Sequence, residues 1–134
     1  MEPPSSFAKA PPAPVEVRAL EKIIASLSQD VDDVYERLDI LEKYTVWLKD
    51  LEKKNPQNAY IQALLGLNYS HLAEIRTELG VNAIDYWAYI SEVVDPLKYT
   101  AKQHLDTALS APDLEQSVRA WSHYYRGTLT EEYD

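Results

Sequence analysis

Residues 17–48 carry a continuous heptad repeat, in which apolar side chains recur at alternating spacings of three and four residues. The a positions are Val17, Ile24, Val31, Leu38 and Thr45, and the d positions are Leu20, Leu27, Val34, Leu41 and Leu48. Mostly β-branched a positions with mostly leucine d positions are the arrangement that parallel two-stranded coiled coils favour. The repeat therefore predicts a long coiled-coil-like helix, over about 15–54, whose apolar strip lies against another helix.

The rest of the chain is predicted to be helical as well. Glycine occurs only three times in 134 residues, and no segment alternates apolar and polar residues between turn signals. This favours an all-α fold, and the length suits one compact domain. The first helix should lead into a bundle of four to five helices, spanning 15–127 in all. The further helices are expected at about 56–79, 83–94, 96–109 and 111–126.

Local start and stop signals set these boundaries. Asn55-Pro56 is predicted to start the second helix, and Gly80 is predicted to end it in the left-handed conformation. Asp95-Pro96 predicts either two helices or one kinked helix over 83–109. The apolar stripe of that region, which is expected to face the core, consists of Ala83, Trp87, Ile90, Val94 and Leu97.

The two ends of the chain differ in composition from the helical region. Residues 1–14 include five prolines and predict an extended arm, because proline-rich segments favour polyproline II and bury no core of their own. Residues 128–134 are polar and acidic, and predict a tail outside the bundle.

The first helix changes character along its length. Its apolar strip is narrow as far as Val34 and widens from Tyr35 onward, where Tyr44 and Trp47 join it. The narrow half predicts a projecting rod that needs a partner helix, and the wide half predicts burial in the bundle, with Trp47 in the core. The aromatic side chains of the last helix suit an interface too. The predicted interface residues are Val17, Leu20, Ile24, Leu27, Val31, Val34, Trp121, Tyr124 and Tyr125.

Charge and composition narrow the classes of partner. The net charge of −9 argues against direct nucleic-acid binding, which needs clustered lysine and arginine. The chain has no cysteine, and its longest uncharged stretch is too polar to span a membrane. No leader-like segment opens the sequence, so a cytoplasmic setting is expected.

Two groups of polar residues are candidates for a metal-binding or catalytic site. His71, Glu74 and Glu78 share a helical face, but a di-iron bundle needs a second such set, and none is present. Arg119 and His123 resemble the Arg and His of HEPN ribonucleases, although three residues separate them rather than four to six. We therefore predict no catalytic, metal-binding or cofactor-binding residues.

Two further positions carry structural predictions. Residues 56–73 resemble the first helix of a tetratricopeptide repeat, although no second repeat follows. In that resemblance Gly66 marks a close helix crossing. Asn68 interrupts an apolar stripe, which indicates either a core polar group satisfied by a neighbouring helix or a residue that fixes register at an interface.

These observations predict a non-enzymatic structural or adaptor subunit. It would assemble with itself or with another protein through its first helix. The alternative is an acidic regulatory protein that occupies a basic surface of a partner, such as a surface that binds nucleic acid. The sequence leaves open which partner it is and how the helices are oriented.

Overall fold

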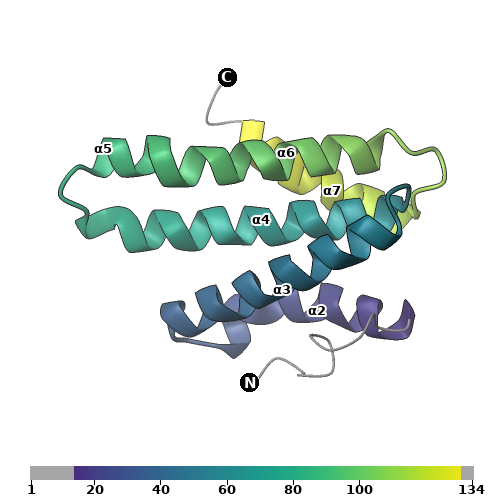
Figure 1. Ribbon diagram of the computed structural model, residues 1–134, viewed down its shortest axis with the longest axis horizontal. Coiled ribbons are helices and arrows are strands. Elements are labelled where there is room, and N and C mark those ends of the chain that lie inside the picture. Colours follow the sequence, from purple (N-terminus) through teal and green to yellow (C-terminus); the bar gives the residue numbers. More distant parts are fainter. Residues whose placement is uncertain (1–13, 131–134) are drawn as a thin grey trace.

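The computed structural model describes residues 14–130. Within that range the chain is helical and contains no strand, which confirms the predicted all-α class. The main helices are α2 (Pro14–Asp30), α3 (Val34–Lys54), α4 (Ala59–Leu79), α5 (Tyr86–Tyr89), α6 (Asp95–Leu109) and α7 (Gln116–Thr130) (Figure 1). Residues 1–13 of the predicted arm and 131–134 of the predicted acidic tail lie outside the described residues. The remaining parts of both predictions are corrected, because Pro14 begins α2 and residues 128–130 end α7, where Leu129 is buried.

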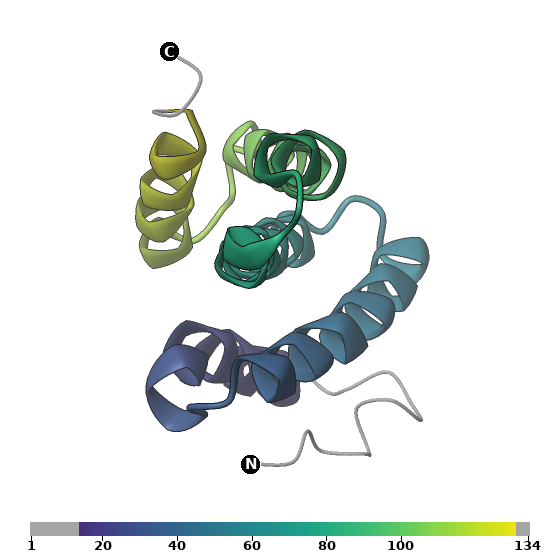
Figure 2. The same cartoon turned by 90° about the vertical axis from the view of Figure 1, so that its left-hand side faces the viewer.

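Helix α4 lies at the centre of the bundle. Helix α6 runs antiparallel along one side of it, α3 crosses its opposite side, and α7 packs against both α4 and α6 (Figures 1 and 2). Leucine side chains from α3, α4 and α6 are fully buried between these helices, and these include Leu41, Leu48, Leu64, Leu65 and Leu105. Helix α4 is therefore buried on several sides.

The close pairing of α4 with α6 depends on Gly66. A methyl group at this position would lie 2.5 Å from Leu105 Cγ and 3.2 Å from the carbonyl oxygen of Ala101. Both distances are too short for ordinary packing, so the absence of a side chain lets the two helices approach. The predicted close crossing at Gly66 is confirmed.

The predicted single helix over 15–54 is wrong, because residues 31–33 break it. The side chain of Asp33 accepts a hydrogen bond from the backbone N–H of Tyr35 at 2.9 Å and caps α3. Aspartate is a poor residue in a helix interior and a good one at an N-cap, which favours a break here. Helix α2 folds back beside α3, and the two form a hairpin below α4 (Figures 1 and 2).

The region 83–109 forms one rod rather than two separate helices. A π-helical turn, Ile90–Val94, joins α5 to α6, and Pro96 lies in the first turn of α6. Proline has no N–H to donate, and its ring crowds the carbonyl group four residues before it. The wider π turn accommodates both effects, so the rod is not sharply kinked (Figure 1).

Three predicted helix starts are corrected. Helix α4 begins at Ala59, after Asn58, whose side chain accepts from the N–H of Ile61 at 3.0 Å. Helix α5 begins at Tyr86 rather than residue 83, because the side chain of Asp85 caps it. Helix α7 covers 116–130 instead of 111–126, since residues 110–115 form the connection from α6.

The predicted role of Gly80 is also corrected. Its φ of −80° is ordinary right-handed backbone, so this position does not need glycine for a left-handed turn. A side chain here would instead collide with the ring of Tyr89. Glycine is therefore required at this position because the ring of Tyr89, at the end of α5, occupies the space that a side chain would need.

Candidate interaction surface

The heptad side chains of α2 are covered by the chain's own helices. Leu20 and Ile24 are fully buried, and Val17, Leu27 and Val31 are nearly so. They belong to the same core cluster as side chains of α3 and α4, and Val34 packs against that cluster while staying partly exposed. The predicted projecting rod with an open apolar strip is therefore corrected: the helix that covers the strip belongs to the same chain.

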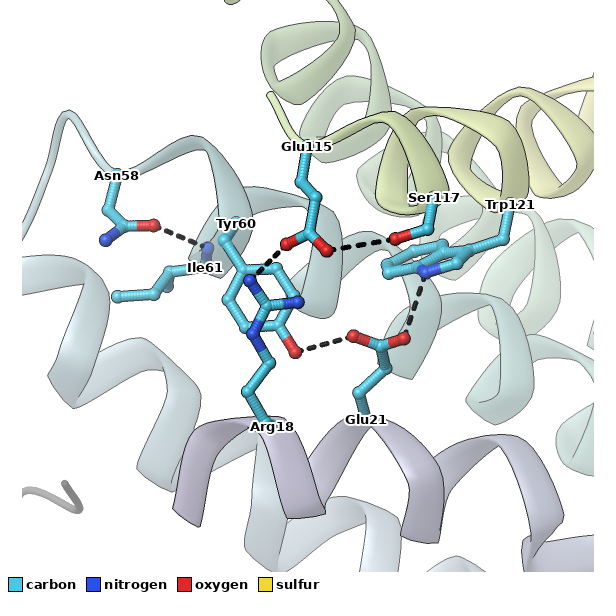
Figure 3. Close-up of polar contacts among 8 residues, drawn as sticks. All are labelled: Arg18, Glu21, Asn58, Tyr60, Ile61, Glu115, Ser117 and Trp121. Carbon is cyan, nitrogen blue, oxygen red and sulfur yellow. Dashed lines mark hydrogen bonds and ion pairs between the residues drawn. The ribbon is translucent and has the colours of Figure 1, made fainter. Parts of the chain in front are cut away.

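A cluster of polar contacts fastens α2 to α4 and α7 (Figure 3). The carboxylate of Glu21 on α2 accepts from the Tyr60 hydroxyl of α4 at 2.6 Å and from Trp121 Nε1 of α7 at 3.1 Å. Burial and the bond to Glu21 both raise the pKa of Tyr60, which keeps its hydroxyl protonated as a donor. One carboxylate therefore joins three helices.

Arg18 adds a second set of contacts at the same place. Its guanidinium pairs with Glu115, just before α7, and lies 4.4 Å from the centroid of the Tyr60 ring (Figure 3). This pair is half exposed, so water and salt weaken it. The contacts of Arg18 and Glu21 with Tyr60, Glu115 and Trp121 are called the α2 clasp below.

The three aromatic residues of α7 that were predicted to form an interface differ in their exposure and their contacts. Trp121 is partly buried in the α2 clasp, and Tyr125 packs edge-on against both Trp121 and Tyr124. Tyr124 is 66% exposed and lines an open groove of about 620 Å³. The groove carries side chains of both charge signs, among them Arg37 and Glu74. Of the three aromatic residues, Tyr124 is the one that the fold leaves largely open.

Three exposed apolar side chains lie close together in the sequence, from the end of α4 to the first turn of α5. Val81 is 65% exposed, Ile84 is fully exposed and Trp87 is 76% exposed, although Trp87 was expected in the core. This segment, Val81–Trp87, lies at one end of the molecule (Figure 1), and is called the α4–α5 tip below. An exposed tryptophan beside an exposed isoleucine is unusual on a surface without a partner.

The α4–α5 tip is held in a defined shape. The ring of Tyr89 packs against Gly80, Asp85 caps the first turn of α5, and the ring of Tyr86 lies edge-on to that of Trp87 at 5.1 Å. These contacts fix the backbone on both sides of Ile84. The apolar side chains are therefore presented by a braced turn.

The surroundings of the α4–α5 tip are acidic. Residues 77–97 contain four acidic side chains, Glu78, Asp85, Glu92 and Asp95, and no lysine or arginine. Asp85 and Glu92 are exposed. This run without a base was visible in the sequence and was the available signal for the site, but it gave no sign that Trp87 would be exposed.

Arg119 and His123 have different surroundings on α7. Arg119 donates to the carbonyl oxygens of Leu109 and Ala111, at 3.0 and 2.5 Å, and so braces the end of α6. His123 is exposed on α7. A catalytic pair should converge on a cleft with a supporting group, whereas here the guanidinium is occupied by backbone carbonyls.

His71, which shares a helical face with Glu74 and Glu78, packs against an aromatic ring. Its ring packs against Tyr125 at 5.6 Å, and burial lowers its pKa. Among the residues that the structure describes, no three histidine, aspartate or glutamate side chains are grouped as metal ligands. The arrangement around His71 is one of packing between α4 and α7.

Asn68 joins α4 to α3 within the core. It is fully buried, and its Nδ2 donates to the carbonyl oxygen of Leu41 at 3.1 Å and to Thr45 Oγ1 at 2.6 Å. Its partners therefore come from a neighbouring helix of the same chain. The first of the two readings of this residue, a core polar group satisfied by a neighbouring helix, is the one that these contacts support.

Comparison of the chain with known protein families, with curated proteins and with solved structures finds no match. Within residues 14–130, no helix is both long enough and apolar enough to cross a membrane. Proposals about function therefore depend on the surfaces described above.

Proposed function

We propose that this chain is a non-enzymatic adaptor subunit, and that its α4–α5 tip docks into an apolar pocket rimmed by basic side chains on a partner protein. The observation that carries the proposal is the joint exposure of Val81, Ile84 and Trp87 on a braced turn. Tryptophan is among the residues that most often dominate the binding energy of an interface. Because the turn is already ordered, docking requires little loss of conformational entropy.

The charge around the tip supports this choice of partner. Asp85 and Glu92 are exposed beside the apolar side chains, whereas Glu78 pairs with Arg37 of α3 at 3.7 Å and Asp95 lies near Lys98. Acidic groups at the rim of an interface speed association with a basic surface and disfavour acidic ones. An anionic membrane would be repelled for the same reason, so a protein pocket fits the tip better than a lipid surface.

The remaining polar groups support a non-enzymatic role. Arg119 holds the end of α6, and the α2 clasp holds a helix in place, so both sets of residues have structural contacts to account for them. A cytoplasmic setting stays a prediction from the sequence.

The contact is tested by site-specific photo-crosslinking of the full chain. A photoreactive phenylalanine at Asn82, an exposed position of the α4–α5 tip that leaves Trp87 in place, is compared with the same group at Val46, which is 73% exposed on α3. We expect a defined adduct from position 82 and none from position 46. The crosslinked protein is then purified and titrated by calorimetry, where Trp87→Ala should weaken binding by about 30-fold or more. Val46→Ala should leave the affinity unchanged.

Two outcomes would contradict this proposal. One is equal loss of affinity in Trp87→Ala and Val46→Ala with the purified partner. The other is tighter binding of wild type to phosphatidylserine vesicles than to the crosslinked protein. Asp85→Asn/Glu92→Gln should slow association and reduce its salt dependence, while changing dissociation little.

A second candidate function is an acidic regulator that occupies a basic surface of its partner. The net charge of −9 and the exposed carboxylates of Asp85 and Glu92 favour it. It is tested by competition: a short DNA duplex should displace the chain from the crosslinked partner if that surface also binds nucleic acid. Simultaneous binding of both would exclude this version and leave the adaptor role.

The non-enzymatic part is tested by comparing wild type with Arg119→Ala and His123→Ala in an RNA cleavage assay. We expect no cleavage by any of the three proteins. Cleavage by wild type that is lost in both variants would contradict the proposal.

A further inference from the structure

The heptad phase continues across the break between α2 and α3. Leu27, Val31 and Val34 keep the spacing of four and three residues that the repeat has on either side, although residues 31–33 are not helical. If the connection between α2 and α3 contained extra residues or shifted the heptad phase, the repeat would be interrupted there. Here the same residues can be read as a hinge or as part of one straight helix.

The hinge is short, and few groups hold it. It contains three residues, and Asp33 closes it by capping α3 at Tyr35 N. Straightening would place Asp30 and Asp33 three residues apart on one helix, where like charges repel. The carboxylates therefore favour the bent form, and their removal should favour the straight one.

The contacts of α2 can be supplied by another copy without change. Its buried side chains, such as Leu20 and Ile24, pack in the core formed with α3 and α4. Its polar side chains, Arg18 and Glu21, contact Tyr60, Glu115 and Trp121. All of these partners lie beyond the hinge, so an identical α2 from a second chain would fill the same site.

We propose that this chain forms a domain-swapped dimer, in which α2 and α3 straighten into one helix and each α2 occupies the place of α2 in the other copy. Short hinges favour such exchange, since an identical segment is traded at low cost. The proposal accounts for the uninterrupted heptad repeat, which the folded-back hairpin alone does not require. It rests on the hinge and on the contacts of α2, and does not use the α4–α5 tip.

The first test changes the hinge in opposite directions. Asp32→Ala/Asp33→Ala removes the α3 cap and two charges, and should raise the dimer association constant at least about tenfold. Asp32→Pro disfavours a straight helix and should abolish the dimer. The substitution costs no backbone hydrogen bond in the bent form, because the N–H of Asp32 donates none there. Sedimentation equilibrium over a range of concentrations measures both, and circular dichroism shows that each variant is folded.

The second test asks which chain supplies α2. Because the protein has no cysteine, Arg18→Cys/Glu115→Cys gives two unique thiols across the α2 clasp. A short bis-maleimide should join them within one chain in the Asp32→Pro background. In the Asp32→Ala/Asp33→Ala background it should join two chains, giving a covalent dimer on a denaturing gel. Single-cysteine variants control for random collisions.

Three results would overturn the proposal. They are a wild type and alanine variant that stay monomeric at every concentration, a dimer that persists unchanged in Asp32→Pro, and crosslinks that stay within one chain in a dimeric sample. None of these depends on Trp87, so failure here leaves the tip proposal standing. Likewise, failure of the tip proposal leaves the dimer proposal standing.

Discussion

Helix α4 pairs with α6 and with α2 in two physically different ways. The α4–α6 contact depends on a missing side chain at Gly66, into which Leu105 fits. The α2 contact depends on an apolar strip of ordinary heptad type together with the α2 clasp, in which the Arg18–Glu115 pair is half exposed. The first is a matched fit between two particular residues, and the second can be satisfied by any helix with the same pattern.

This difference indicates which part of the bundle is fixed and which part can exchange. A close crossing tolerates no substitute, because protein interiors are packed without spare room. An apolar strip and a few half-exposed polar bonds are less selective, since salt bridges at the surface contribute little. We therefore expect α3, α4, α6 and α7 to form the stable body, and α2 to open first.

The largest effect should come from Trp47, which is 6% exposed on α3, in agreement with the burial predicted from the sequence. Trp47→Ala should lower the free energy of unfolding by about 3–5 kcal/mol, because it leaves a cavity where α3 meets the body. The matched variant Trp87→Ala should change it by less than about 0.5 kcal/mol, as that ring is exposed. Equal effects in urea denaturation would show that α3 is not part of the stable body.

The next effect tests the close crossing. Gly66→Ala should destabilise the bundle by about 1–2 kcal/mol, because the clash with Leu105 outweighs the helix propensity gained. Gly127 is the control, since a methyl group there meets nothing within 4 Å. Gly127→Ala should stabilise α7 by about 0.5–1 kcal/mol. Stabilisation by both changes would mean that α4 and α6 can move apart without loss.

Acid should weaken the body more than the α2 contact. Burial lowers the pKa of His71 and of His104, which contacts Gln62 at 2.7 Å. The unfolded chain then binds more protons than the folded one, so this stability is present above about pH 6.5 and is lost as the pH falls below it. Thermal melts should show a decline of Tm from about pH 7.5 to about pH 5.

A variant identifies the source of that decline. His71→Phe should flatten the pH dependence of Tm, because the ring still packs on Tyr125 and no longer accepts a proton. His123→Gln controls for the loss of an exposed histidine. A decline that is identical in wild type and His71→Phe would exclude His71 as a contributor.

The smallest effect concerns the α2 clasp. Tyr60→Phe removes the bond to Glu21 and should cost about 0.5–1.5 kcal/mol, which appears as faster hydrogen exchange in α2 with little change in α4. Tyr99→Phe, which alters a tyrosine that is 64% exposed, should change neither. Faster exchange throughout the bundle would mean that α2 opens together with the body.

Several features of the fold could be predicted from local patterns. Gly66 marked a close crossing, because that signal depends on one helix and its immediate neighbour. Helix starts were less predictable. Asn55 and Asn58 are three residues apart and both can cap a helix, so the choice between them depended on where α3 had to end.

The candidate site was harder to predict than the fold. Trp87 lies on an apolar stripe with Val94, and the sequence assigned both to the core, but Trp87 is exposed and only Val94 is covered. Tyr124 and Tyr125 are neighbours on α7, yet the first is exposed and the second is packed against Trp121. Exposure is set by what lies opposite a residue, and a single sequence does not show it.

The sequence by itself determined that the chain is helical, that residues 17–48 carry a strip made for another helix, and that Trp47 is buried. These follow from composition and periodicity, which act along one helix. Only the tertiary structure decided that the strip is covered by the same chain, because the bend at 31–33 brings α2 back onto its own core. A heptad repeat specifies that one helix packs against another. The length and shape of the connection between α2 and α3 decide whether that other helix belongs to the same chain.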